Sequence, residues 1–340
     1  MKSCQRVASC QPLSISGGQP SRVSFEALLL LPVQGPGCIR EGVESSPRIG
    51  IMASCWRGNI EEGKSLSSKY VVICGSGLLP RLIVEELESR NVAVELLVLP
   101  GVRLEWLLDR SATEIGLGNF VRVLTERWNR GARHLVLAGA VKRPKYQTSN
   151  ERQILGDAPV DLAAGDDEVL GALLAQIAAI GFDIQGAHQV LPELLVEASQ
   201  LTSFVPSRDD RQDVERASQI VHQLGLVDVG QAAVVVQGLC VAVETATGTD
   251  DMLGRSIDSL PLVRPKQDGA RGVLYKAPKP NQDLRVDLPT IGPETVRLAA
   301  SAGLAGIAFE AGGVLLLERQ TSVNLADRAG MFMWSRPAAS

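Results

Sequence analysis

The segment with the clearest chemical pattern is 276–293, KAPKPNQDLRVDLPTIGP. Prolines stiffen this segment, and it carries three cations, two carboxylates and two amides: Lys276, Lys279, Arg285, Asp283, Asp287, Asn281 and Gln282. Cations bind phosphate oxygens, whereas paired carboxylates hold Mg²⁺ or orient a water molecule. Because functional side chains concentrate on loops held in a rigid frame, we predict a phosphate-handling site here.

A glycine turn, Gly75-Ser76-Gly77, separates an apolar run from a helix that Pro80 opens. Small residues let a phosphate approach the backbone N–H groups at a helix N-terminus. Pro80 stands where the dinucleotide fingerprint needs its third glycine, so the pattern does not favour NAD. A tight turn without a ligand explains the two glycines equally well.

Two further charged segments flank predicted elements. Lys142 and Arg143 follow the predicted strand 134–138, at the carboxyl end where open α/β sheets bind ligands. A solvated basic loop is the alternative. Asp166 and Asp167 precede an apolar helix, where carboxylates cap the first turn or contact a metal or a substrate hydroxyl.

The segment 244–251, ETATGTDD, leaves another predicted strand. Thr249 and Asp250 could cap a helix that starts at Met252. Glu244 and Asp250 could instead offer oxygen ligands to a hard cation. The residues alone leave both interpretations open.

Alternating strands and helices must position these segments in the first half of the chain. The predicted strands are 70–74, 92–99, 134–138 and 183–186, and the predicted helices are 80–89, 118–130 and 168–180. This alternation indicates a parallel, doubly wound sheet of the Rossmann-like α/β type.

The second half has a different pattern. The β-rich runs 231–236 and 239–244 flank Gln237-Gly238, which predicts a hairpin. A polar amphipathic helix, 209–224, could link the halves, and strands 273–276, 306–310 and 314–318 with a helix at 293–302 complete a mixed α+β domain.

We therefore divide the chain into residues 1–68, a Rossmann-like α/β domain at 69–208 and an α+β catalytic domain at 209–340. Residues 1–68 are rich in Ser, Gly, Gln and Pro without sustained periodicity, which predicts a disordered leader or a start assigned too early, with Met52 as the alternative start.

Composition limits the classes of function. The chain has 340 residues, a net charge of -4 and a pI near 5.6, which argues against general nucleic-acid binding. The sequence has no apolar run of about 18 residues, the length that spans a membrane. Cys74 and Cys240 lie in apolar runs, which predicts buried free thiols in a reducing, cytoplasmic compartment.

Seven segments in this order resemble the LpxI family of UDP-2,3-diacylglucosamine pyrophosphatases. They are CGSGLLP (74–80), AGAVKRP (138–144), GDD (165–167), GAHQVLP (186–192), DVGQAAVV (228–235), GTDDML (248–253) and the loop 276–293. The resemblance covers 69–333. Thr247 departs from an acidic residue expected there, and Asn281 from a common glycine.

The resemblance implies hydrolysis of UDP-2,3-diacylglucosamine to 2,3-diacylglucosamine 1-phosphate (lipid X) and UMP in lipid A biosynthesis, assisted by Mg²⁺. It implies two domains with the substrate between them. Asp283 would be the essential carboxylate with Asp287 beside it, and both are candidate metal ligands. The implied substrate-binding set is Gly75, Gly77, Lys142, Arg143, Asp166, Asp167, Thr249, Asp250, Lys276, Lys279, Gln282 and Arg285.

The resemblance further implies a cytoplasmic protein of a Gram-negative bacterium whose partner is a lipid-linked nucleotide sugar, with peripheral contact at the inner face of the inner membrane. It implies no nucleic-acid partner and leaves a homodimer open. Two rival functions remain: another metal-dependent nucleotide-sugar hydrolase, or a non-enzymatic nucleotide- or lipid-binding regulator on the same fold.

Overall fold

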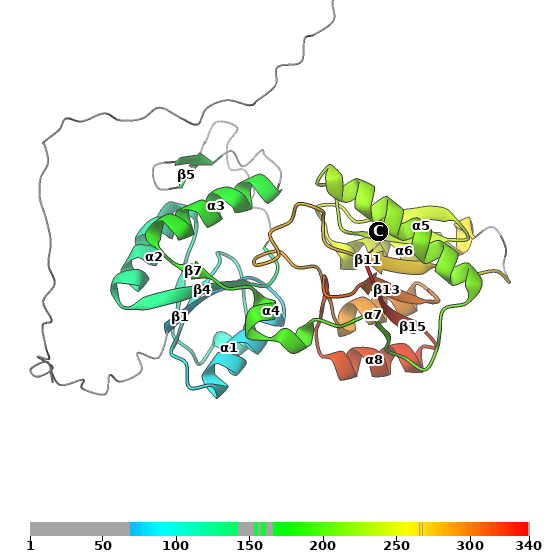
Figure 1. The fold of residues 1–340 in the computed structure, drawn as a ribbon, viewed down its shortest axis with the longest axis horizontal. Coiled ribbons are helices and arrows are strands. Elements are labelled where there is room, and N and C mark those ends of the chain that lie inside the picture. The colour runs from blue at the N-terminus through cyan, green and yellow to red at the C-terminus, as the bar shows by residue number, and fades with distance from the viewer. Residues whose placement is uncertain are drawn as a thin grey trace, which may run out of the picture. The chain divides into compact units, whose positions relative to one another are not determined.

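The computed structural model describes residues 69–141, 153–155, 158–160, 166–264, 266 and 268–338, all within one compact unit that spans 62–340 (Figure 1). For 153–155, 158–160, 166–168 and 261 it describes the backbone alone. The predicted leader, Lys142 and Arg143 therefore lie outside the described residues, as do the side chains of Asp166 and Asp167.

The first sheet is wholly parallel, with strand order β3-β2-β1-β4-β7. Its strands are β1 (Lys69–Cys74), β2 (Val94–Val98), β3 (Ala112–Glu114), β4 (Ala132–Ala138) and β7 (Asp183–Ile184). The chain reverses its direction of progress between β1 and β4, which is the switch point where such sheets bind ligands. This topology confirms the predicted Rossmann-like fold.

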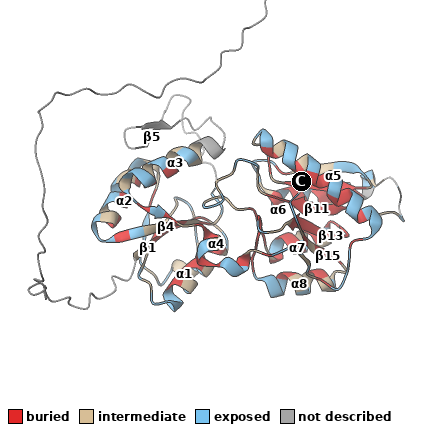
Figure 2. Cartoon of the chain, in the orientation of Figure 1, coloured by how far each residue is buried: buried red, intermediate tan, exposed pale blue. Residues whose placement is uncertain are grey.

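Helices cover both faces of this sheet. They are α1 (Leu79–Ser89), α2 (Phe120–Asn129), α3 (Asp166–Ile180) and α4 (Ala187–Val190). Successive β1 side chains point to opposite faces: Val71 and Ile73 pack with α2 and α3, whereas Val72 and Cys74 pack with α1 and α4. Figure 2 shows the buried strands between the helices. A strand buried on both faces explains the continuous apolar run at 71–74.

The second sheet is mixed, with strand order β10-β9-β11-β13-β15-β8. Its strands are β8 (Ser199–Gln200), β9 (Ala232–Val236), β10 (Leu239–Val243), β11 (Val273–Lys276), β13 (Gly306–Glu310) and β15 (Phe332–Arg336). The predicted hairpin is confirmed. Gln237 and Gly238 have φ of 50° and 82°, and their N–H groups donate to the Asp213 carboxylate at 2.8 and 2.7 Å.

One helix packs on one face of this sheet and three pack on the other. They are α5 (Arg208–Leu226) and, opposite it, α6 (Thr249–Val263), α7 (Pro293–Ser301) and α8 (Arg319–Arg328) (Figure 1). The helix predicted as a possible link is α5, and it buries Val214, Ala217 and Val221 against the second sheet. This mixed sheet with helices confirms the predicted α+β class.

Several short elements lie outside the two main sheets. β12 (Thr290–Ile291) pairs in parallel with β14 (Leu315–Leu316), and β5 (Gln153–Leu155) pairs with β6 (Ala158–Val160). Single 3₁₀ turns occupy Glu105–Leu107, Leu117–Asn119 and Pro192–Leu194. No helix in the described part of the chain has the length and apolarity needed to cross a membrane.

The two strand cysteines differ in environment. Cys74 is fully buried, and burial raises the pKa of its thiol to about 12. The prediction of a buried thiol was wrong for Cys240, which is exposed. β10 is an edge strand that starts exposed, so an apolar run there did not imply burial on both faces.

Candidate functional site

Two cavities of about 540 and 520 Å³ meet at the loop that follows β11. We call them the helix-end cavity, which is lined by the first residues of α1, α6 and α7, and the α3 cavity, which is lined by one side of α3. Arg285 and Asp287 line both, so one charged stretch of the loop separates two spaces of similar size.

The helix-end cavity receives three helix N-termini. Its lining includes Gly77 to Leu79 at the start of α1, Gly248 and Thr249 at α6, and Gly292 and Pro293 at α7. The N-cap residue of each helix makes no side-chain hydrogen bond to the helix. The N–H groups of a first helical turn have no partner within the helix and carry partial positive charge. Three such ends at one cavity favour an anionic ligand.

A buried hydrogen-bonded chain forms part of the wall of this cavity. Lys276 Nζ donates to Thr249 Oγ1 at 2.6 Å and to the Thr290 carbonyl oxygen at 3.1 Å, and Thr249 Oγ1 donates to Glu244 Oε2 at 2.8 Å. Beside the chain, Asp250 Oδ1 accepts from Thr295 Oγ1 at 2.8 Å. The wall therefore offers one ammonium group close to the helix ends.

Asp283 and Arg285 form a two-point ion pair in the α3 cavity. Arg285 Nε and Nη2 donate to the two carboxylate oxygens at 3.0 and 2.7 Å, and the Arg285 backbone N–H donates to Oδ1 at 3.0 Å. These hydrogen bonds, with Arg285 as the main cause, hold the pKa of Asp283 below its ordinary value, although burial opposes the shift. Asp283 is therefore ionised at neutral pH.

A tight turn connects the two carboxylates of the loop. The backbone N–H groups of Val286 and Asp287 both donate to the Asp283 carbonyl oxygen, at 3.0 and 3.1 Å. The Asp287 carboxylate accepts from Gln282 Nε2, and Gln282 Oε1 accepts from the Lys279 N–H at 2.9 Å. Gln282 therefore holds the two ends of the loop together.

The glycine turn after β1 packs on the turn after β4. Ser76 and Ala140 exchange two backbone hydrogen bonds of 2.8 and 2.9 Å. A Cβ atom on Gly75 would lie 2.6 Å from the Ala140 carbonyl oxygen, so this close approach requires glycine. Gly77 has φ of 96° and lines the helix-end cavity.

Comparison with known proteins identifies the family. The family model of the LpxI N-terminal domain matches residues 69–194, and that of the LpxI C-terminal domain matches 197–334. The chain belongs to the LpxI family. It is also 35% identical over 269 residues to the UDP-2,3-diacylglucosamine pyrophosphatase LpxI of Caulobacter vibrioides, an alignment that covers 78% of this chain and 96% of that protein. The resemblance carried by the seven segments is thus confirmed.

The structure brings many of the predicted site residues to the two cavities. Gly77, Thr249, Asp250, Lys276, Arg285 and Asp287 line the helix-end cavity, and Gln282, Asp283, Arg285 and Asp287 line the α3 cavity. Gly75 and Lys279 do not appear in either lining. Gly75 supports the turn as described above, and Lys279 forms an ion pair with Asp228.

Thr249 and Asp250 have a different local role from the cap first considered. The expected helix start at Met252 was wrong, because α6 begins at Thr249 with Gly248 at its N-cap. Thr249 is therefore a first-turn residue whose hydroxyl is bonded to other elements.

Thr290 and Thr295 are site residues that the sequence did not indicate, and Glu244 was considered there only as a possible cation ligand. Strand order, which local sequence patterns do not give, brings Glu244 to the site. β10 and β11 both run antiparallel to β9, which lies between them, so their carboxyl ends share one edge of the sheet. That edge places Glu244, just after β10, near Lys276 at the end of β11.

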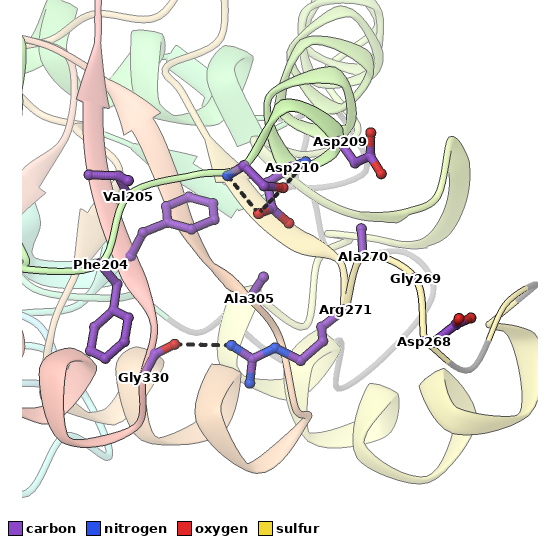
Figure 3. Close-up of a pocket in the computed structure, with 12 residues that line it drawn as sticks. Phe204, Val205, Asp209, Asp210, Asp268, Gly269, Ala270, Arg271, Ala305 and Gly330 are labelled. Carbon is purple, nitrogen blue, oxygen red and sulfur yellow. Dashed lines mark hydrogen bonds between the residues drawn. The ribbon is translucent and has the colours of Figure 1, made fainter.

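A third cavity, of about 430 Å³, lies among Phe204, Asp268, Arg271 and the start of α5 (Figure 3). Two of its polar side chains have structural partners: Asp210 Oδ2 accepts from the N–H and hydroxyl of Ser207, and Arg271 Nη2 donates to the Gly330 carbonyl oxygen at 3.0 Å. None of the predicted site residues lines it. We assign no chemistry to this cavity.

Proposed function

We propose that this protein hydrolyses UDP-2,3-diacylglucosamine to 2,3-diacylglucosamine 1-phosphate (lipid X) and UMP, a step of lipid A biosynthesis. One observation carries the proposal: three helix N-termini and the buried Lys276 line a cavity that shares Arg285 and Asp287 with a second one, whose wall along α3 is mainly apolar. The name of the Caulobacter relative supports the same substrate.

The helix-end cavity suits the diphosphate. A diphosphate diester carries two negative charges, and its bridging oxygen departs with further negative charge on a phosphate. Lys276, Arg285 and the N–H groups of three first turns offer fixed positive charge to both states. Because such donors need no reorganisation when charge develops, they lower the barrier as well as the dissociation constant.

The α3 cavity suits an acyl chain. Its apolar lining comes mainly from one side of α3 and from β7 with its preceding residue: Leu170, Leu174, Ala175, Ala178, Phe182 and Ile184. Removing apolar area from water is worth about 25 cal/mol per Å². An acyl chain along α3 would leave the sugar phosphate beside Asp283, Arg285 and Asp287, where the two cavities meet.

The donor chemistry of Asp283 and Asp287 fits Mg²⁺. Both carboxylates line the α3 cavity, and Asp283 is ionised, as a ligand of a hard cation must be. Within the described residues, His, Cys, Asp and Glu side chains form no group of three or more that could hold a metal ion. Mg²⁺ commonly uses one or two carboxylates and completes its shell with substrate phosphates and water. Bound there, it would neutralise diphosphate charge.

Asp283 is the group that we propose for the proton of the attacking water. The water oxygen forms a bond to phosphorus while the bond to the bridging oxygen breaks, and the carboxylate orients the water and accepts its proton. Arg285 holds that carboxylate by two hydrogen bonds, which fixes its direction before the substrate arrives.

Product analysis of the purified full-length chain tests the proposal. Incubation with UDP-2,3-diacylglucosamine should release lipid X and UMP in equal amounts. Excess chelator should stop the release, and added Mg²⁺ should restore it. Absence of phosphoanhydride cleavage in the presence of Mg²⁺ would refute the function, and full activity in excess chelator would refute the metal.

A further inference from the structure

The chain of Glu244, Thr249 and Lys276 has a function that we infer from its geometry. We propose that Glu244 and Thr249 are positioning residues that hold the Lys276 ammonium at the wall of the helix-end cavity. The proposal deepens the proposed function and rests on it for the identity of the anion that Lys276 binds. Neither residue needs to touch the substrate for this role.

The direction of each hydrogen bond in the chain follows from the chemistry of its groups. An ammonium group only donates, so the Thr249 oxygen must accept from Lys276. A hydroxyl has one hydrogen, and a carboxylate only accepts, so that hydrogen must go to Glu244. The Thr249 hydroxyl therefore has one orientation in this chain.

The N–H donors of Lys276 can be counted in the same way. Its ammonium has three N–H donors, of which Thr249 and the Thr290 carbonyl take two among the described contacts. One donor is left for a ligand in the cavity that Lys276 lines. The hydrogen bonds to Thr249 and Thr290 thus fix the direction of the third N–H of Lys276.

Burial makes this arrangement rigid. Lys276, Thr249 and Glu244 are 5%, 6% and 8% exposed. Buried charges are stable only when they are paired and hydrogen-bonded. In the described contacts, the two charges meet through the Thr249 hydroxyl and not in a direct ion pair. The bridge fixes Lys276 at the cavity wall, and Glu244, which lines the same cavity, supplies the compensating charge.

This geometry also addresses the alternative that Glu244 and Asp250 hold a cation together. Their described partners differ: Glu244 accepts from Thr249, and Asp250 accepts from Thr295. The Glu244 carboxylate already accepts the hydrogen of the Thr249 hydroxyl, and Lys276 fixes the orientation of that hydroxyl. The observed contacts therefore favour a supporting role for Glu244 over metal ligation.

A double-mutant cycle tests the proposal through kcat/KM for UDP-2,3-diacylglucosamine. Thr249→Val keeps the side-chain shape but removes the hydroxyl, and we expect a loss of about 10- to 100-fold, the value of a hydrogen bond to a charged group. Thr249→Ser restores the hydroxyl and should recover most of the loss. In a Lys276→Met background, Thr249→Val should cost nothing further, because the residue acts through Lys276.

Ser256→Ala is the matched control. Ser256 is a buried hydroxyl about two turns along α6 and does not line the cavity, so its loss should leave the rate unchanged. Losses that add fully in the Lys276→Met background, or a Thr249→Ser variant as slow as Thr249→Val, would overturn the proposal. If Thr249→Val does not fold, Glu244→Gln replaces it in the cycle, because a neutral acceptor weakens the same bond.

Direct binding of inorganic pyrophosphate by calorimetry separates this proposal from the proposed function. Affinity should fall non-additively in the same variants, whether or not the nucleotide sugar is hydrolysed. A wild-type protein that binds pyrophosphate but does not cleave the substrate would refute the proposed hydrolysis without contradicting the positioning role of Glu244 and Thr249. Equal pyrophosphate affinity in wild type and Thr249→Val would sink the positioning role.

Discussion

Replacement of Asp283 by alanine should separate turnover from binding. In the structure this carboxylate holds Arg285 by two hydrogen bonds at 2.7 and 3.0 Å. The substitution removes a negative charge beside the diphosphate and releases the guanidinium to bind phosphate. We therefore expect substrate affinity to hold or rise, whereas kcat should fall by about 10² or more, the lower range for loss of a positioned acid–base group.

Stability should change little in the same variant. The Asp283 and Arg285 side chains are 34% and 51% exposed, and ion pairs at such sites contribute roughly 0–1 kcal/mol. Thermal unfolding of Asp283→Ala should therefore resemble that of wild type. Glu126→Ala is the matched control, because it removes a carboxylate paired with Arg122 on the exposed side of α2, and it should leave kcat unchanged.

Single-turnover kinetics and direct substrate binding together measure the two effects. The pH profile adds a third test. The depressed pKa of Asp283 means that its ionised form persists as pH falls, so the acid limb caused by this group should lie below the ordinary range of an aspartate. Turnover within about tenfold of wild type, or a loss confined to binding, would remove Asp283 from the chemistry.

Three further substitutions test the surrounding structure. Ala175→Trp fills the α3 cavity and should lower kcat/KM more for long-chain than for short-chain diacyl substrates. Ala179→Trp, on the same helix but outside the cavity lining, should not show this difference. Equal effects of Ala175→Trp on both substrates would contradict the acyl-chain assignment. Gly75→Ala should lower the free energy of unfolding by about 1–3 kcal/mol, because the added methyl group would lie 2.6 Å from a backbone carbonyl oxygen. Gly118→Ala, where a methyl group would meet no atom within 4 Å, is the control and should be near neutral in urea unfolding. Asp213→Asn should cost about 1–3 kcal/mol, because only one hairpin N–H keeps its acceptor. Burial raises the pKa of the Asp213 carboxyl in the folded state. The stability that this shift contributes is therefore present below the pKa of Asp213 in the unfolded chain and is lost as pH rises through its pKa in the folded protein. Urea unfolding at several pH values should show that this pH dependence of the unfolding free energy disappears in Asp213→Asn.

Local sequence patterns predicted most of the fold. β11 and β13 were predicted with the bounds that the structure has, and the Gln237-Gly238 hairpin was correct because its turn chemistry is local. The patterns failed for α8 and β15, neither of which was predicted. α8 buries only Ser322 and Ala326 among its described residues, so its sequence has no clear apolar stripe.

The site was less predictable than the fold, because its contacts join distant parts of the chain. Glu244 and Lys276 meet through Thr249 only because β9 lies between β10 and β11, and strand order is not written in any local pattern. The loop composition correctly indicated charged groups around a cavity. It gave no sign that Asp283 pairs with Arg285 in the α3 cavity, or that Lys279 pairs with Asp228.

The same strand-to-helix connection accounts for the three helix N-termini at the helix-end cavity, whose lining also includes the carboxylates of Glu244, Asp250, Asp287 and Glu294. α1 follows β1, α6 follows β10 and α7 follows β12, so each helix begins just beyond the carboxyl end of a strand. A helix that starts there presents its uncapped N–H groups at that strand edge. Three such units line one cavity, and Lys276 ends a fourth strand beside them. Most of the attraction for a diphosphate is thus built into the backbone, which explains how a chain with a net charge of -4 can offer an anion site with few cationic side chains.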